Sequence, residues 1–124
     1  MTPLLIKSFR AALIVAGNRI VSAAADGEVN TASANTDPSI GISDAMGAEA
    51  GRMVDLTQVG WAELKLGGTV SAGDPLTSDA EGRGVKAAPV AGTEVRVAAI
   101  AMADGELDEI IPVLVAPSVL ATPV

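Results

Sequence analysis

The sequence predicts an all-β fold with at most one short helix. Turn residues recur at short intervals, most clearly in residues 67–89, where Gly73-Asp74-Pro75 and residues 80–84 separate short β-prone segments. Glycine supplies the positive φ and proline the fixed φ that tight turns need. Apolar and polar residues alternate over residues 53–59 and 61–66, which indicates half-buried strands. We therefore expect a small β-sandwich or barrel-like domain.

The same two signals, alternation and turn residues, place the individual elements. Strands are expected at residues 4–9, 13–15, 19–22, 39–43, 53–59, 61–66, 94–102 and 109–115, and residues 28–34 are expected as a weak strand or a loop. The strands at 53–59 and 61–66 are expected to join at Gly60. Residues 44–51 are the one segment where a helical turn is expected, with Asp44 as its cap and with Gly47 and Gly51 limiting its length.

The chain length predicts one domain. Both ends of the chain are expected to be extended. Residues 1–22 are expected to form an N-terminal arm or the first strands, residues 23–115 the β domain, and residues 116–124 an extended C-terminal tail. The prolines of this tail favour extended backbone, either disordered or laid along a neighbouring molecule. No internal repeat with a period of about 20 to 50 residues is visible.

The composition removes most catalytic chemistry. The chain has no His, Cys or Tyr, so the commonest general base, the thiolate nucleophile and the soft metal ligands are absent from the sequence. Four acids gather at Asp104, Glu106, Asp108 and Glu109, but without the ligand spacing of an EF-hand calcium loop, which favours a solvated turn. We expect no catalytic residue, no cofactor and no metal site.

The charge is divided unevenly along the chain. Residues 1–25 contain three cations and no acid, a net of +3, so the other 99 residues carry −10 of the total −7. Only five Lys and Arg residues follow residue 25, which argues against nucleic-acid binding. No apolar run approaches the ~20 residues of a membrane-spanning helix. The high mean hydropathy of +0.44 beside this charge indicates that a partner covers part of the apolar surface.

Two places are candidates for that contact. The first is the basic N-terminal segment, which reads either as a first core strand or as an arm that pairs with the sheet edge of an acidic partner. The second is a tryptophan, which reads either as a core or strand-end residue or as a subunit-interface anchor. The candidate interface residues are Leu4, Leu5, Ile6, Lys7, Phe9, Arg10 and Trp61.

The order of these segments resembles that of the capsid cement, or head decoration, proteins of tailed phages, of Mu-like and related siphophage type. The similar stretches are Ala24-Ala25-Asp26-Gly27, residues 40–44 with Gly47, residues 59–64, residues 67–79 with Gly82, Gly84, Val85 and Ala87, and residues 111–117. The resemblance implies a β-rich virion protein on the outside of the head. There it would tie neighbouring major capsid protein subunits together at local three-fold positions, usually as a homotrimer and in some relatives as a dimer. It implies no catalytic residues.

The expected function is therefore to stabilise the expanded capsid from its exterior, after synthesis in the host cytoplasm. Two alternatives stay open. One is a tail, fibre or baseplate structural module, and the other is a small carboxylate-dependent hydrolase. A hydrolase would need two carboxyls across a cleft, and the sequence cannot place any pair of its acids in that way.

Overall fold

The computed structural model describes residues 3–24, 27–88 and 94–121, and within them the chain folds entirely into strands, turns and loops. This confirms the all-β fold class. The strands are β1 (Pro3–Arg10), β2 (Ile20–Ala23), β3 (Val29–Thr31), β4 (Ser39–Ser43), β5 (Met53–Lys65), β6 (Pro75–Ser78), β7 (Gly84–Lys86), β8 (Glu94–Ala101) and β9 (Ile110–Ala121). They are antiparallel neighbours in one curled sheet with the order β3-β2-β4-β5-β9-β8-β6-β7, and β1 pairs with β5 outside this path.

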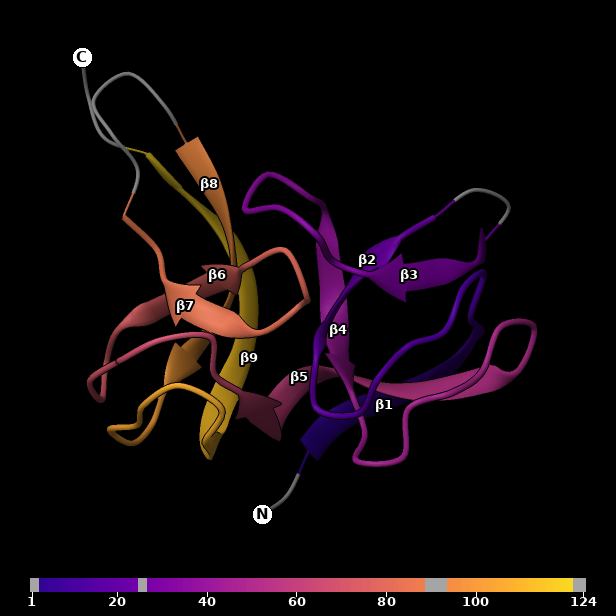
Figure 1. Cartoon of the computed structure of the whole chain (residues 1–124), viewed down its shortest axis with the longest axis horizontal. Helices are drawn as coiled ribbons and strands as arrows, with labels where there is room; N and C mark the ends of the chain where they lie inside the picture. The colour runs from indigo at the N-terminus through magenta and orange to yellow at the C-terminus, as the bar shows by residue number, and fades with distance from the viewer. Residues whose placement is uncertain (1–2, 25–26, 89–93, 122–124) are drawn as a thin grey trace.

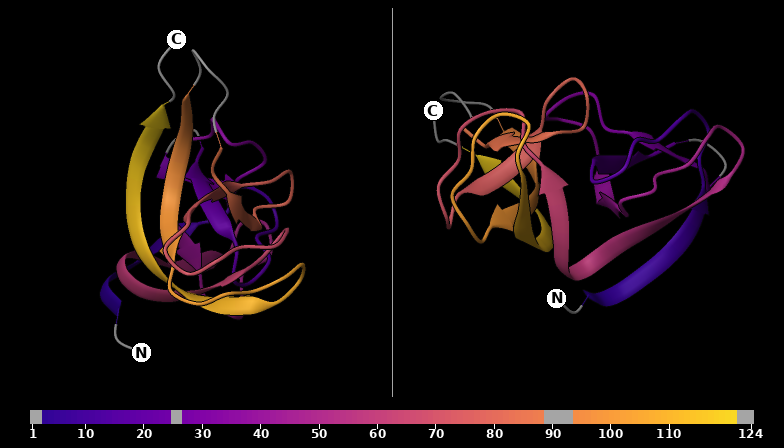
Figure 2. Two further views of the ribbon diagram at one scale, coloured as in Figure 1. Left: turned by 90° about the vertical axis from the view of Figure 1, so that its left-hand side faces the viewer. Right: turned by 60° about the horizontal axis from the view of Figure 1, so that its bottom comes forward.

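The long strand β5 connects two lobes of the molecule (Figure 1). It is one continuous strand rather than the two we expected, and it bends sharply at the buried Gly60, whose φ is 100°. L side chains rarely adopt this conformation, so glycine is the residue that allows the strand to turn the corner. β1 pairs along residues 53–60 of β5, and β9 pairs along residues 60–65 (Figure 2, right).

The two lobes repeat one arrangement of strands. We call residues 3–59 the N-terminal unit and residues 61–121 the C-terminal unit. The isolated bridges Ala11↔Val29 and Leu66↔Gly84 are parallel and 55 residues apart at both ends (11 to 66, 29 to 84). In the same way, Lys7↔Leu56 in the β1–β5 pair corresponds to Ala62↔Val113 in the β5–β9 pair. This repeat has a spacing longer than the periods we considered from the sequence.

Loop hydrogen bonds repeat with the strands. Val15 and Ala48 exchange two backbone hydrogen bonds of 2.8 Å, and Val70 and Gly105 exchange two of 2.9 and 3.1 Å. The backbone also turns through positive φ at equivalent places, with 76° at both Gly27 and Gly82. Each unit therefore has a first strand, a hairpin and two further antiparallel strands, and the bridge at the end of its first strand closes the curl.

The buried side chains of the two units also occupy equivalent positions. The smaller cluster belongs to the N-terminal unit and contains Ala11, Val15, Val21, Val29, Val54 and Leu56. Shifting these positions by 55 residues, or by 57 for the last strand, gives Leu66, Val70, Leu76, Gly84, Ile111 and Val113, and all but Gly84 belong to the larger cluster. Five of six core positions are thus apolar in both units.

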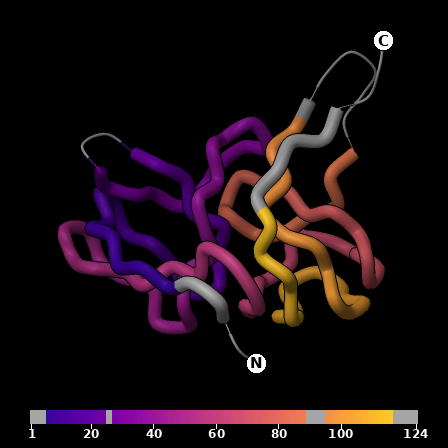
Figure 3. Tube along the Cα trace, turned by 180° about the vertical axis from the view of Figure 1, so that it is seen from behind, coloured from indigo at the N-terminus to yellow at the C-terminus, as the bar shows by residue number. Residues whose placement is uncertain are grey.

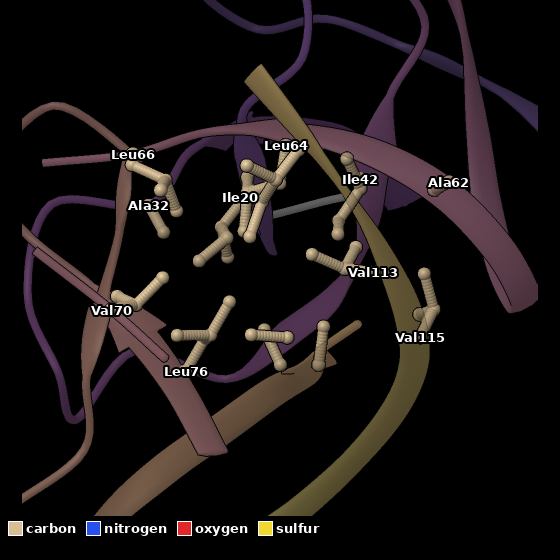
Figure 4. Close-up of a cluster of buried hydrophobic side chains, with 14 residues drawn as sticks. Ile20, Ala32, Ile42, Ala62, Leu64, Leu66, Val70, Leu76, Val113 and Val115 are labelled. Carbon is tan, nitrogen blue, oxygen red and sulfur yellow. The ribbon is translucent and has the colours of Figure 1, made fainter. Parts of the chain in front are cut away.

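The larger cluster also holds the two units together. Ile20, Ala32 and Ile42 come from the N-terminal unit and pack among Leu64, Leu76 and other side chains of the C-terminal unit (Figure 4). Each of these three residues is fully buried. Because burial of an aliphatic side chain contributes about 1.5 to 3 kcal/mol, this contact couples the folding of the two units.

Three expectations differ from the structure. Residues 44–51 form turns and no helix: Asp44 Oδ1 accepts hydrogen bonds from the amides of Met46 and Gly47, but Gly47 has a φ of 62° and Ala48 pairs with Val15, so the turn does not continue. Residues 13–15 form no strand beyond the bridge at Val15. Residues 116–121, expected as part of a tail, continue β9 and pair with β8 of the same chain; residues 122–124 lie outside the described part.

Candidate interaction surface

The expected interface residues of the N-terminal segment lie in β1, which is a paired strand of the sheet and not a detached arm. Leu4 and Leu5 lie at the start of β1, where Leu5 pairs with Val59. Ile6, Lys7 and Arg10 are exposed, whereas Phe9 is half-buried and packs against the core of the N-terminal unit. Phe9 therefore supports the fold.

Ile6 and Trp61 occupy equivalent positions on the outer face of the sheet. Ile6 pairs with Thr57, and Trp61, 55 residues later, pairs with Leu114. Trp61 is 37 % exposed and Ile6 is 52 % exposed. Trp61 is thus a surface residue and not part of the core, which leaves the interface reading of this tryptophan open.

The outer face carries further large apolar side chains on the same strands. We define the outer apolar face as the exposed residues of β1, β5 and β9, namely Ile6, Met53, Val59, Trp61, Ile110 and Leu114. Two cations lie among them at equivalent positions, Arg10 opposite Met53 and Lys65 opposite Ile110. Exposed apolar side chains gathered on one face of paired strands are typical of a protein contact surface, although the pairs Ser8–Asp55 and Glu63–Pro112 lie between some of them.

A second apolar surface lies on the loops of the N-terminal unit. The apolar tip consists of Leu13, Ile14 and Met46, which are 64 %, 70 % and 89 % exposed. Its two loops are held together by the hydrogen bonds between Val15 and Ala48. In the C-terminal unit the residues equivalent to Leu13 and Ile14 are Gly68 and Thr69, so the loop forms without apolar side chains there.

Arg83 organises the hairpin turn between β6 and β7. Its side chain lies 2.9 Å from Asp79, 3.6 Å from Glu81 and 3.1 Å from Asp108. Desolvation lowers the pKa of the Arg83 guanidinium, but the hydrogen bond and charge of Asp79, with those of Asp108 and Glu81, outweigh it and raise the pKa above its usual range. Asp108, one of the four acids gathered in residues 104–109, therefore helps to hold this turn through Arg83.

A shallow pocket of about 370 Å³ lies between the units, lined by Asn35, Thr77, Asp79 and Lys86 among others. Its carboxylate, Asp79, already accepts hydrogen bonds from the Arg83 side chain and from the amides of Glu81 and Arg83. Among the described residues, no three acidic side chains are grouped so that they could hold a metal ion. No helix in residues 3–24, 27–88 and 94–121 is long and apolar enough to cross a membrane.

Comparison with known proteins gives a likeness among solved structures. No protein-family model matches the chain, and no curated protein sequence matches it. Among solved structures, the chain is similar to the head fiber gp8.5 N base in bacteriophage phi29, with a TM-score of 0.67 and 17 % sequence identity. The match covers 90 % of this chain and 93 % of that chain. At this identity the likeness establishes a shared fold over nearly the full length of both chains.

The sequence indicated Ile6, Lys7, Arg10 and Trp61 as surface candidates but missed the apolar tip. Residues 13–15 read as a strand because Leu13, Ile14 and Val15 are apolar and β-prone, whereas only Val15 points into the core. The available signal was comparison with residues 68–70, Gly-Thr-Val, in which only the last residue is apolar.

Proposed function

We propose that this chain is a structural protein of a bacteriophage virion that binds the outer surface of the head and cements neighbouring major capsid protein subunits. The observation that supports it most directly is the full-length fold likeness to a phage head fiber base. The sequence resemblance to head decoration proteins points to the same part of the virion. We further propose that the protein works through binding alone, without catalysis or a cofactor.

The two exposed apolar surfaces give this proposal its physical basis. The outer apolar face and the apolar tip lie on paired strands and on hydrogen-bonded loops, so binding would order few additional residues. Contacts that exist only on the assembled shell would convert binding free energy into shell stability. A homotrimer, or else a dimer, would strengthen each contact through the high effective concentration of its other subunits.

The experiment is sedimentation of the purified protein with expanded empty heads that lack it. We expect co-sedimentation, many copies per head, and a higher melting temperature of the decorated heads. Native mass spectrometry of the free protein is expected to give a trimer. A protein that stays in the supernatant and leaves the melting of the heads unchanged would contradict the proposal.

A second candidate is the base of a fibre on the head, favoured by the name of the structural neighbour. The same sedimentation assay separates the two functions by stoichiometry. A cement protein saturates a large set of equivalent lattice sites, whereas a fibre base brings a further fibre polypeptide to the head. Heads reconstituted with this chain and then mixed with the remaining virion proteins would reveal the fibre by negative-stain microscopy.

A further inference from the structure

The strand β1 has one edge that no other strand of the described chain covers. β1 pairs with β5 along its other edge over its full length. The amide of Ala11 donates to Arg52 O, on the β5 side, whereas the amide of Ala12 donates to Val29 O on the opposite side. Because backbone groups alternate along an antiparallel strand, the N–H and C=O groups of Ser8 and the N–H of Arg10 point away from β5, whereas the C=O of Arg10 lies beside Val29 in the Ala11↔Val29 bridge.

The repeat shows what an occupied version of this edge looks like. In the C-terminal unit, the positions equivalent to Ser8 and Arg10 are Glu63 and Lys65. The N–H of Lys65 donates to Asn18 O at 2.9 Å, and Asn18 Nδ2 donates to Glu63 O at 3.2 Å. Asn18 of the neighbouring unit thus satisfies both the N–H of Lys65 and the C=O of Glu63. The equivalent groups on β1, the N–H of Arg10 and the C=O of Ser8, face no described residue of this chain.

The hairpin turns of the two units also differ in whether the neighbouring unit packs against them. A Cβ at Gly82 would lie 2.5 Å from Thr31 Cγ2 and 2.9 Å from Ile20 O, because this turn packs against the N-terminal unit. A Cβ at the equivalent Gly27 would meet no atom of the described residues within 4 Å. At both places, the N-terminal unit therefore has no described residue against the surface that corresponds to the contact surface of the C-terminal unit. Figure 3 shows the two units from behind, with the indigo and purple N-terminal unit at one end of the molecule.

A second copy of this chain is poorly suited to occupy the free edge of β1. Its C-terminal unit would have to pack there as the N-terminal unit packs on the C-terminal unit within one chain. That packing depends on Asn18, Arg19 and Ile20, and the amide of Ile20 donates to Gly82 O at 2.7 Å. Their equivalents in the C-terminal unit are Gly73, Asp74 and Pro75, so the amide donor and the positive charge are both missing. Pairing of β1 with β1 of another copy would bring Lys7 and Arg10 close to like charges.

The charges beside the edge favour a different occupant. Lys7 and Arg10 are both exposed, and neither makes an ion pair with a described residue. By the β1–β5 register, Lys7 lies on the inner face with Leu56 and Arg10 on the outer face with Met53, so the two cations flank the edge on opposite sides. Residues 1–25 contain no acid, and the acid nearest to Arg10 by register is Asp55 on the outer face, which accepts the Ser8 hydroxyl.

We propose that an extended, acidic segment of the capsid surface adds to the sheet as a strand on the free edge of β1. Its backbone hydrogen-bonds with Ser8 and Arg10, and its carboxylates pair with Lys7 and Arg10 on the two faces. This inference rests on the proposed function and specifies how the contact is made. Apolar residues of the same partner would lie on the adjoining outer apolar face, beside Ile6.

The test uses Ser8→Pro, with Ser8→Ala as its matched control. Proline removes the N–H that points away from β5 and leaves the hydrogen bonds between β1 and β5 intact, which is why proline is tolerated on edge strands. Both variants lose the hydroxyl that donates to Asp55 Oδ1, so the control accounts for that bond. The probe is expanded empty heads lacking this protein, and circular dichroism and thermal unfolding check that each variant is folded.

We expect Ser8→Pro to weaken binding to heads by at least about tenfold and Ser8→Ala by less than about threefold, because only proline blocks strand addition. Arg10→Glu is expected to weaken binding and to reduce its dependence on salt. Hydrogen exchange of the wild-type protein provides a readout that does not depend on variant folding. The amides of Ser8 and Arg10 should exchange fast in the free protein and slowly on heads.

The possible outcomes separate the two proposals. Binding to heads with fast exchange at Ser8 and Arg10, or with full affinity of a folded Ser8→Pro variant, overturns strand addition but leaves the cement function standing. Slow exchange at these amides in the free protein, together with an oligomer that Ser8→Pro dissociates, would assign the edge to a second copy and overturn the acidic capsid segment. No binding to heads at all would overturn both proposals.

Discussion

At the scale of single residues, Gly60 determines the path of the chain. It is buried, has a φ of 100°, and lies where β5 passes from one unit to the other. We expect Gly60→Ala to lower the free energy of unfolding by about 1 to 3 kcal/mol, since an L side chain is strained in this conformation. Urea unfolding measures the change.

Gly68→Ala is the matched control for that substitution. Gly68 is half-buried, its φ is not positive, and the nearest atom to an added Cβ is Val85 Cγ1 at 4.0 Å. We expect its effect to stay within about 0.5 kcal/mol, as for substitutions away from strained or tightly packed sites. Equal losses in both variants would show that the positive φ at Gly60 is not the cause.

Arg83 shows how a surface cluster stabilises a turn. We expect Arg83→Gln to lower the melting temperature, because Asp79, Glu81 and Asp108 lose their shared cation. A group whose pKa is raised on folding contributes stability that is lost only as pH rises through its folded pKa. The raised pKa of Arg83 lies far above neutrality, so the difference from wild type should be constant between about pH 6 and pH 9. A melting difference that falls steadily across this range would contradict this account.

Residue identities also show why the repeat is hard to see in the sequence. At the bridge that closes each curl, the small Ala11 lies opposite Val29 in one unit, and the large Leu66 lies opposite Gly84 in the other. The two pairs fill similar space with exchanged sizes, as cores tolerate when total volume is kept. A Cβ at Gly84 would lie 2.5 Å from Leu64 Cδ2. The combined volume of each pair is similar in the two units, but a residue-by-residue comparison of the sequences does not detect this similarity.

At the scale of the element, the two loops of the N-terminal unit carry side chains that the fold does not require. We expect Ile14→Thr, which introduces the residue at the equivalent position of the C-terminal unit, to change stability by less than about 0.5 kcal/mol. Under the proposed function it should weaken binding to expanded heads measurably, because Ile14 is 70 % exposed and available for contact.

Thr69→Ala, in the equivalent loop, provides the control and should leave head binding unchanged. If Ile14→Thr also binds heads with wild-type affinity, the apolar tip does not contact the capsid. Thermal unfolding of both variants separates a binding effect from a loss of fold.

The strands themselves were largely predictable because they depend on local patterning. Residues 39–43 match β4 in full, and the alternation over residues 53–66 gave β5 apart from its continuity through Gly60. Loop residues 13–15 were misjudged because strand-like composition does not show which side chains face a core.

For the interaction surface, Ile6, Lys7, Arg10 and Trp61 could be chosen from charge and residue type. The free edge of β1 depends on pairing between distant segments, which local patterns do not reveal.

At the scale of the whole molecule, the N-terminal segment belongs to the fold. Deleting residues 1–10 removes β1, uncovers one edge of β5 and takes Phe9 from the core of the N-terminal unit. If the segment were a detached arm, one of the two interpretations of the sequence, such a deletion would weaken binding and leave the fold intact. From the structure we expect loss of cooperative unfolding, or a decrease in stability of at least about 3 kcal/mol, since the deletion removes the whole β1–β5 pairing together with the packing of the half-buried Phe9.

Circular dichroism during thermal unfolding measures this effect. The control is deletion of residues 122–124, at the opposite end of the chain, which lies beyond the last residue of β9. A truncated protein that melts at the wild-type temperature after loss of residues 1–10 would show that β1 is an accessory strand.

The bend at Gly60 has a consequence for how such a chain could grow. The position equivalent to Gly60 at the end of the C-terminal unit is Pro117, and the ring of proline holds φ negative, so β9 runs on beside β8 where β5 turned into another unit. Proline at this position therefore prevents the bend by which the first unit continues into the second. A chain carrying Pro117→Gly followed by a second copy of residues 61–121 should turn there as β5 turns at Gly60. Its third lobe would lack the contacts that Asn18, Arg19 and Ile20 make between the first two units, so small-angle scattering should show an increased maximum dimension with a loosely held end.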